Sequence, residues 1–473
     1  MAKFYSSLTE IKSKLDSGAE TVEKLVAGYL HQIKANGHLN VFNEVFDEEA
    51  RMRAAEVDSR IKQGTAGKLA GMVVAIKDNI CYKGHKVSAS SKILSDFTSI
   101  YSSTVVERLL AEDAVIIGRC NCDEFAMGAS NESSYFGPVK NYADNTRVSG
   151  GSSGGSAVAV QAGMCHAAIG TDTGGSVRQP ASFCGVIGFK PTYGRISRHG
   201  IIAYASSFDQ VGPITRSVED AALLYGIMAG TDDYDSTLSG EPVNMKPVLA
   251  DNSKKRIAYL QESISSPGVD AEVKTSLIDY IEKLRRDGHT VEPVTSEYLD
   301  YLVPAYYILA TAEASSNLAR YDGVHYGYRS AEATDLTSTY KKSRSEGFGK
   351  EVKRRIMLGT FVLSSGYYDA YYAKAQKVRR LIQERTKTIL NEYDFLLLPT
   401  APEPAYEIGK GETDPVRSYL ADIFTVQASL AGVPAISLPV GNNSKGLPLG
   451  LQLLSKHFSE QELLNFSEYF LKL

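Results

Sequence analysis

Two loops rich in glycine and serine carry the residues best suited to chemistry. Residues 150–156 read Gly-Gly-Ser-Ser-Gly-Gly-Ser, and residues 171–176 read Thr-Asp-Thr-Gly-Gly-Ser. Glycine allows backbone N–H groups to approach a ligand closely. The second loop could therefore present Ser176 as a nucleophile and donate hydrogen bonds to a developing oxyanion. Taken alone, loops of this composition are more often flexible turns.

A candidate base stands further upstream. Lys77 follows the apolar run 72–76, which is typical of a buried strand, and sites of α/β proteins gather at strand ends. A serine hydroxyl is a weak nucleophile unless a base removes its proton, and a lysine can do so when burial keeps its amine neutral. Without the two loops, a solvated lysine at a strand end would be the simpler interpretation.

Three other kinds of site fit the sequence less well. A phosphate-binding loop is not indicated, because neither G-x-x-x-x-G-K-[ST] nor a helix-opening G-x-G-x-x-G occurs. The esterase pattern G-x-S-x-G is present with Ser153 at its centre, yet it arises by chance in such runs and no histidine lies in a loop context tied to an acid. Cys120 and Cys122 lack a second pair at zinc spacing, so we expect no metal site.

The composition is that of an ordinary globular protein and excludes several function classes. Of the 473 residues, 43% are hydrophobic and 22% charged, which is incompatible with a disordered or fibrous chain. A net charge of −4 predicts no general attraction to nucleic acid or anionic lipid. No apolar run has the length of a signal or a membrane span, and five sparse cysteines indicate free thiols. We expect a cytoplasmic protein without membrane attachment.

Alternating helical and strand-like segments predict the fold that must position these residues. Helices are expected within residues 6–35, where they should pack on a sheet, and at 105–110, 157–162, 271–287 and 370–393. Strands are expected at 72–76, 114–118, 166–170, 395–398 and 435–440. We predict an α/β fold with a central mixed β-sheet covered by helices on both faces. It would form one large domain over residues 1–473, with a helical insertion near residues 300–370.

The motifs together resemble the amidase signature family. The resemblance is carried by Lys77 after its apolar strand, by both loops, by Arg178 and by the segment 184–192, Cys-Gly-Val-Ile-Gly-Phe-Lys-Pro-Thr. The intervals of 75 residues from Lys77 to Ser152 and of 24 from Ser152 to Ser176 also look like those of the family. The similarity extends from about residue 21 to residue 470, and it implies amide hydrolysis on the amidase signature fold.

By this resemblance the chain holds a Ser–Ser–Lys triad. Ser176 matches the nucleophile, Ser152 the bridging serine on a cis peptide bond, and Lys77 the terminal base. Ser152 would relay the proton, which agrees with the lack of a histidine in either loop. Backbone N–H groups would hold the oxyanion, at about 3 kcal/mol per donor. These oxyanion positions are Thr173, Gly174 and Gly175, and Asp172 and Arg178 are expected to brace the loop.

Three further segments narrow the resemblance to the glutamine-hydrolysing A subunits of tRNA-dependent amidotransferases. They are residues 123–128, 313–323 and 352–369. This subgroup implies a heterotrimer in which the partners are a B subunit and a small C subunit. The chain would hydrolyse glutamine without a cofactor of its own and pass ammonia to the B subunit. There ATP and Mg²⁺ would serve to amidate glutamyl-tRNA(Gln), or aspartyl-tRNA(Asn) in some organisms, with the tRNA bound mainly by the B subunit.

The same resemblance implies a pocket for the amino-acid end of glutamine. Arg355 matches the position that binds the α-carboxylate, where a guanidinium fork can reach both oxygens, and Asp422 matches the position that binds the α-ammonium. The remaining pocket positions are Met127, Gly128, Ser130 and Tyr306. The Ala129-Ser130 pair departs from the expected pattern. Judged by residues alone, the basic run 341–355 fits a solvated helical face better than a tRNA contact.

Two other functions remain open at this point. One is a free-standing amidase acting on a small carboxamide. The other is a catalytically silent assembly scaffold, which would have no need to retain Lys77, Ser152 and Ser176 together.

Overall fold

The computed structural model of the chain describes residues 5–410 and 421–473. Its strands are β1 (Phe42–Val45), β2 (Val73–Lys77), β3 (Val115–Cys120), β4 (Ala167–Asp172), β5 (Ile187–Lys190), β6 (Gln210–Thr215), β7 (Arg256–Leu260), β8 (Thr290–Val294), β9 (Phe395–Pro399), β10 (Ala435–Asn442) and β11 (Pro448–Leu454). The longer helices are α1 (Leu8–Asp16), α2 (Val22–Ala35), α3 (Asp47–Gln63), α4 (Thr104–Ala111), α5 (Gly154–Gln161), α7 (Val218–Met228), α9 (Ala271–Arg286), α10 (Leu299–Asn317), α11 (Leu336–Gly347), α12 (Lys350–Leu363), α13 (Lys374–Glu392) and α17 (Glu460–Phe470). The shorter ones are α6 (Arg178–Cys184), α8 (Glu262–Ser265) and α16 (Val426–Ala431).

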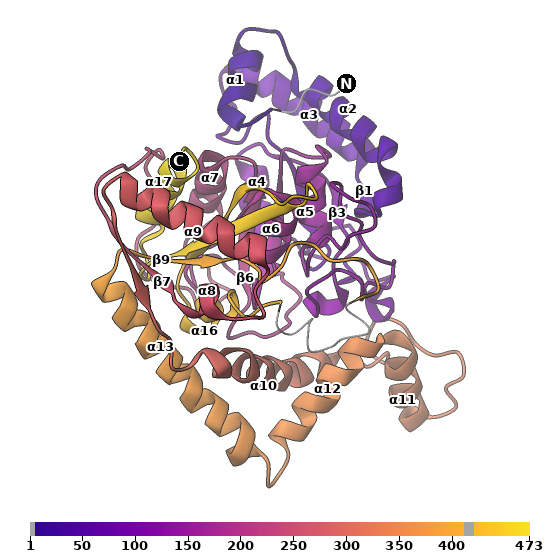
Figure 1. Cartoon of the computed structure of the whole chain (residues 1–473). Coiled ribbons are helices and arrows are strands. Elements are labelled where there is room, and N and C mark those ends of the chain that lie inside the picture. Colours follow the sequence, from indigo (N-terminus) through magenta and orange to yellow (C-terminus); the bar gives the residue numbers. More distant parts are fainter. Residues whose placement is uncertain (1–4, 411–420) are drawn as a thin grey trace.

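All the named strands belong to one eleven-stranded mixed sheet (Figure 1). The strand order is β1-β3-β2-β4-β6-β5-β10-β11-β9-β7-β8. The pairs of β2 with β3 and β4, and of β7 with β8 and β9, are parallel, whereas the other pairs are antiparallel. Helices α5 and α6 pack on the central strands, as do α7 and α17. The predicted mixed sheet with helices on both faces is confirmed.

The predicted strands form where expected, because each is a short apolar run that the sheet buries. Every residue of β2, β3 and β9 is buried. Helix α5 begins earlier than predicted, at Gly154 rather than at residue 157. A side chain at Gly155 would stand 2.8 Å from the Val41 carbonyl oxygen. Close packing, and not helix propensity, therefore brings the end of the first loop into the helix.

The two N-terminal helices do not lie directly on the sheet as predicted. Helix α2 packs against α3, and α3 in turn covers β3. The inner face of α3 is made of small residues, with Ala50 and Ala54 fully buried, so α3 fits closely on the sheet and keeps α2 away from it. Helix α1 is tied to α7, because the Leu8 N–H donates to Asp220 at 3.0 Å.

The C-terminal half adds a helical layer below the sheet (Figure 1). Helix α10 packs against α12 and α13, and α13 packs against α16. The layer extends to the end of α13, so it is longer than the predicted insertion. A π-helix at Tyr368–Ala373 precedes α13, where the sequence predicted the helix to start. The layer has a hydrophobic core of its own, to which α10 contributes Leu309 and Ala310. Within the described ranges, no helix has both the length and the apolar character needed to cross a bilayer.

The predicted functional loops lie between these two parts of the molecule. The second loop connects β4 to α6 and touches α10, because a side chain at Gly174 would stand only 2.5 Å from the Tyr306 ring. The sheet thus supplies one wall of the site and the helical layer the other.

Candidate active site

Lys77 ends β2 and is completely buried among hydroxyl groups. Its Nζ atom lies 2.7 Å from Ser152 Oγ, 2.9 Å from Ser153 Oγ and 3.0 Å from Thr171 Oγ1. Burial lowers the pKa of the Lys77 ammonium to about 8, against the opposing effects of Cys122 and nearby carboxylates. No carboxylate forms an ion pair with this amine within the described chain. A substantial fraction is therefore neutral near physiological pH and able to accept a proton.

The structure brings the two loops together but leaves the Ser176 hydroxyl free. The peptide bond between Gly151 and Ser152 is cis. The Ser153 N–H donates to the carbonyl oxygen of Ser176 at 3.1 Å, so a backbone hydrogen bond joins the two loops. Ser176 is 8% exposed, and its hydroxyl makes no hydrogen bond to any described residue. Lys77 and Ser152 are hydrogen-bonded, whereas no hydrogen bond joins the Ser152 and Ser176 hydroxyl groups in the described structure.

The nucleophile loop offers unpaired backbone donors beside Ser176. In the described part of the chain, the N–H groups of Gly174, Gly175 and Ser176 make no hydrogen bond. Gly175 has φ of +139°, and a side chain there would overlap the Thr425 hydroxyl. That hydroxyl donates to the Gly174 carbonyl at 2.6 Å and fixes the direction of the peptide. Free amides next to a nucleophile are the arrangement needed for an oxyanion hole.

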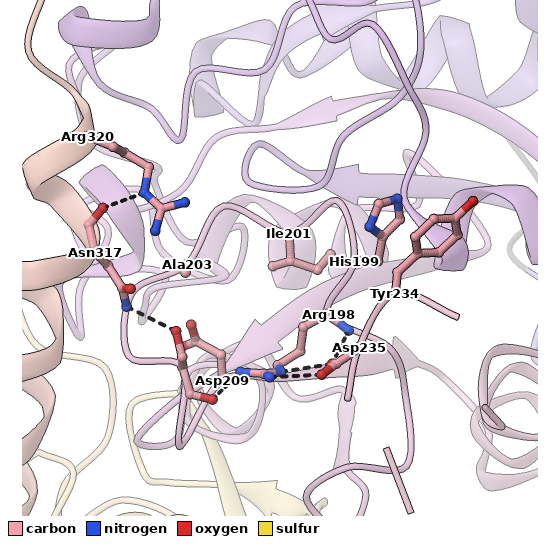
Figure 2. Close-up of a pocket in the computed structure, with 10 residues that line it drawn as sticks. Arg198, His199, Ile201, Ala203, Asp209, Tyr234, Asp235, Asn317 and Arg320 are labelled. Carbon is pink, nitrogen blue, oxygen red and sulfur yellow. Dashed lines mark hydrogen bonds and ion pairs between the residues drawn. The ribbon is translucent and has the colours of Figure 1, made fainter. Parts of the chain in front are cut away.

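Thr173, the first predicted oxyanion position, is hydrogen-bonded through its side chain to a buried carboxyl group. Its hydroxyl donates to Asp209 at 2.7 Å, and Asp209 also accepts from the Tyr204 and Ala205 N–H groups. Burial raises the pKa of Asp209 to about 6. On its other side, Asp209 lines a cavity of about 230 Å³ that also contains Arg198, paired with Asp235 (Figure 2). Asp209 thus separates this cavity from the loop.

Asp172 and Arg178 brace the loop, as the sequence suggested. Both are fully buried and form two contacts of 3.0 Å, from Arg178 Nε and Nη2 to the two carboxylate oxygens. Arg178 also donates to the Thr425 carbonyl and to Gln452 Oε1, each at 3.0 Å. Burial would raise the pKa of Asp172, but the guanidinium outweighs it and lowers that pKa. The pair ties β4 and α6 to β11 and to the start of α16.

A buried cation on α12 and a buried anion in the turn before α16 lie near each other. Arg355 of α12 bonds to Glu351 at 2.9 Å through Nε and to the Tyr204 hydroxyl at 2.7 Å through Nη1, leaving Nη2 without a partner among the described residues. Asp422 accepts from the Tyr307 hydroxyl at 3.4 Å. Burial raises the pKa of Asp422 to about 7, although Arg355 acts to lower it. The described contacts include no ion pair between Arg355 and Asp422.

The other predicted pocket positions lie around the nucleophile. The Tyr306 ring packs on Gly174, and Ser130 is adjacent to the cis peptide, because a side chain at Gly151 would stand 2.7 Å from the Ser130 nitrogen. Gly128 packs on the Asp123 carboxylate. Met127 is fully buried in the core of the helical layer, so it supports this loop from behind.

Sequence reasoning missed the residues that hold these loops in place. Gln179 accepts from the Gly151 N–H at 3.0 Å and donates to the Ala129 carbonyl at 2.9 Å. Asp123, Asp209 and Thr425 were likewise not expected, although Asp123 lies in one of the resembling segments. The contacts of Gln179 with Gly151 and of Thr425 with Gly174 join residues that lie 28 and 251 positions apart, and no local pattern signals such pairs.

The alternative sites find little support in the structure. Ser153 is fully buried, and its hydroxyl bonds to Thr171 and contacts Lys77, so it is not available as an esterase nucleophile. Two residues of the basic run 341–355 bond within the chain, because Arg344 donates to two backbone carbonyls and Lys353 to one, which does not favour a tRNA contact there. Within the described ranges, no group of three or more His, Cys, Asp or Glu side chains is placed to hold a metal ion.

Comparison with known proteins defines the class to which this fold and site belong. The family model described as Amidase matches residues 24–464, and the chain belongs to the amidase family. A protein of Chlorobium phaeobacteroides, named as the A subunit of glutamyl-tRNA(Gln) amidotransferase, is 51% identical over 471 residues, covering 98% of each chain. Its namesake in Chlorobaculum tepidum is 50% identical over 97% of this chain and 96% of its own.

Solved structures agree with these relatives. The crystal structure of the glutamyl-tRNA(Gln) amidotransferase A subunit of Thermotoga maritima superposes with a TM-score of 0.79 at 40% identity, covering 95% of this chain and 91% of its own. The native peptide amidase of Stenotrophomonas maltophilia has a TM-score of 0.80 at 29% identity, covering 98% and 95%. The fold is thus shared with amidases of other names, whereas the higher identities are to amidotransferase subunits.

Proposed function

We propose that this chain is the glutamine-hydrolysing A subunit of a tRNA-dependent amidotransferase that converts glutamyl-tRNA(Gln) to glutaminyl-tRNA(Gln). The observation that carries the proposal is the buried pair Arg355 and Asp422, which form no ion pair with each other among the described contacts. Asp422 lies beside the nucleophile loop, since the Thr425 hydroxyl bonds to the carbonyls of both Asp422 and Gly174. A cation and an anion so placed suit the carboxylate and ammonium of an α-amino acid. The names of relatives at about 50% identity support the same activity.

The proposed reaction is acyl transfer through a serine ester. Ser176 Oγ attacks the side-chain amide carbon of glutamine while its proton passes to Ser152, whose own proton passes to the neutral Lys77 amine. For this step the Ser176 hydroxyl must turn to Ser152. The N–H groups of residues 173–176 stabilise the tetrahedral oxyanion.

Collapse of this intermediate breaks the carbon–nitrogen bond. The leaving nitrogen takes the proton back from Lys77 through Ser152 and departs as ammonia, leaving a glutamyl ester on Ser176. Water, deprotonated by the same relay, then attacks the ester, releases glutamate and restores the Ser176 hydroxyl. The cycle needs no metal or organic cofactor in this chain.

The rest of the reaction belongs to partner subunits in this proposal. Ammonia would pass to a B subunit that binds most of the tRNA and uses ATP and Mg²⁺ to activate the glutamyl group, and a small C subunit would complete a heterotrimer. The complex would act in the cytoplasm. Aspartyl-tRNA(Asn) would be the acceptor in an organism where that route is used.

Ammonia release from L-glutamine tests the proposal. The purified chain should show a low rate alone and a higher rate when mixed with B and C subunits, ATP, Mg²⁺ and glutamyl-tRNA(Gln). Ser176→Ala should abolish hydrolysis in both settings while leaving the circular dichroism spectrum and the assembly of the complex intact. Full activity on simple carboxamides without partners would instead identify a free-standing amidase, and glutaminase activity retained in Ser176→Ala would exclude the mechanism.

A further inference from the structure

One turn of the chain contacts both walls of the site. Residues 123–127 lie between β3 and residues 128–133, the pocket loop, and Glu124 within this turn is only 2% exposed. Its carboxylate accepts the Gly349 N–H, with donor distances of 2.9 Å and 3.1 Å to its two oxygens. The Ser91 hydroxyl donates to the same carboxylate. None of the roles described above uses Glu124.

The partner of this carboxylate is the residue that begins α12. Gly349 is the N-cap of the helix, and a side chain there would overlap Glu124. A carboxylate at this position accepts a hydrogen bond from a backbone donor, and its negative charge interacts favourably with the positive end of the helix dipole. The segment before α12 is fixed as well, because Phe348 packs edge-on against Phe125 at 5.6 Å between ring centroids. The start of α12 is therefore held by the turn on two sides.

The opposite end of the turn is bonded to the triad loop. The Asp123 N–H donates to the carbonyl oxygen of Ser152 at 3.2 Å. The Asp123 carboxylate accepts the Asn131 N–H at 2.9 Å and the Ser133 hydroxyl at 2.7 Å, which fixes the pocket loop. Phe125 and Ala126 have positive φ values of 51° and 59°, a backbone conformation that residues with side chains adopt only when their surroundings hold them. The turn is thus a short connection from Ser152 to α12.

From these contacts we infer that Glu124 is a positioning residue for glutamine binding, which clamps the start of α12 so that Arg355 stands at a fixed place relative to Ser176. The inference rests on the proposed function, because it assigns Arg355 to the α-carboxylate. Arg355 lies on the same helix and is itself held by Glu351 and Tyr204, so a shift of the helix start moves the guanidinium with it. A clamp of this kind affects binding of the amino-acid end and not the chemistry at Ser176.

Two variants loosen the clamp from opposite sides. Glu124→Met keeps the length of the side chain and removes both acceptors, whereas Gly349→Ala places a methyl group against the carboxylate. Both should raise KM for glutamine about tenfold or more, because a displaced Arg355 would lose its charged hydrogen bond to the α-carboxylate, with kcat within about twofold. Glu124→Gln retains one acceptor oxygen and should restore most of the affinity.

A matched control and a second substrate separate positioning from general damage. Glu460 is also 2% exposed and accepts a backbone N–H, that of Thr192 at 3.0 Å, but it lies away from α12, so Glu460→Met should leave KM unchanged. Hydrolysis of 4-aminobutanamide, which is glutamine without its carboxylate, should be equally slow in the wild type and in Glu124→Met. In an Arg355→Lys background, Glu124→Met should add no further rise in KM.

Three results would overturn the inference: a fall in kcat with KM unchanged, an equal loss with 4-aminobutanamide, or additive effects of Glu124→Met and Arg355→Lys. If Glu124→Met does not fold, Gly349→Ala decides by the same measurements. Failure of the proposed function would look different, because the wild-type chain would then release no ammonia from glutamine at all.

Discussion

Lys77 is surrounded by hydroxyl and carbonyl oxygens, and these neighbours determine whether its amine can act as a base. Carboxylates in contact with the amine would keep it protonated, whereas Ser152, Ser153 and Thr171 hold it in place without a negative charge. A second fully buried lysine, Lys190, illustrates the difference. Its Nζ atom donates to the carbonyls of Pro191 and Val433, and among the described residues no hydroxyl group bonds to it. Burial makes either amine less basic, but only Lys77 is connected to a serine.

The pH dependence of glutamine hydrolysis should report this base. Burial lowers the pKa of Lys77 to about 8 and raises that of Asp422 to about 7. Both groups are in their active forms, a neutral amine and a carboxylate, at high pH, so kcat/KM should rise with pH from 6 to about 8.5 and then level off. Asp422→Asn should lose the lower part of the rise and keep the part near 8. Rates that fall over this range would contradict the assignment of Lys77.

Among the elements, the junction of β4 with α6 contains a completely buried ion pair. The buried Asp172–Arg178 pair holds this junction, and Arg178 reaches on to Thr425 and Gln452. Removing one partner of a buried pair leaves an uncompensated charge, which typically costs about 3–5 kcal/mol. Arg178→Met should therefore lower the midpoint of thermal unfolding by several degrees. It should also reduce kcat, because the oxyanion loop lies between Asp172 and Arg178.

An exposed ion pair provides the control for this prediction. Arg51 and Asp47 on α3 lie 2.6 Å apart with half of each side chain in solvent. Arg51→Met should change the free energy of unfolding by less than about 1 kcal/mol, as is usual for exposed pairs. Equal stability losses in the two variants, measured by urea titration, would show that the buried pair does not brace the loop.

The strands and the motif residues could be predicted from the sequence, whereas the contacts that support them could not. Strands such as β2 and β9 are predictable because burial on both faces requires a continuous apolar run. The Ser and Lys positions were predictable because their motifs are local and their spacing resembles that of a known family. The support of Thr173 by Asp209 and of Gly174 by Thr425 was not, since such pairs exist only after distant segments pack.

The position of α2 was missed for a related reason. Its apolar stripe is buried, as periodicity requires, but periodicity does not say whether the cover is a strand or another helix. In the folded chain α3 takes the place on the sheet, and α2 packs on α3.

At the scale of the whole molecule, the site joins two hydrophobic cores. Lys77 ends a strand of the sheet, and Ser152 and Ser176 lie in loops next to β4 and α5, whereas Arg355 and Tyr306 stand on α12 and α10 of the helical layer. The layer has its own apolar cluster around Leu309. A zwitterionic ligand that reaches from Ser176 to Arg355 would bridge the two parts, so binding should hold them together more firmly.

Hydrogen–deuterium exchange with a bound but unreacted substrate tests this bridging. In Ser176→Ala, saturating glutamine should raise the midpoint of thermal unfolding, because ligand binding to the native state adds stability. It should also slow amide exchange in α12 and in the adjoining part of α10, with little change in β10, whose hydrogen bonds already belong to the sheet. Butyramide, which lacks both charged groups, should leave the exchange of α12 unaltered. Equal protection of α12 and β10 by glutamine, or equal protection of α12 by butyramide, would show that the ligand does not connect the helical layer to the sheet through Arg355 and Asp422.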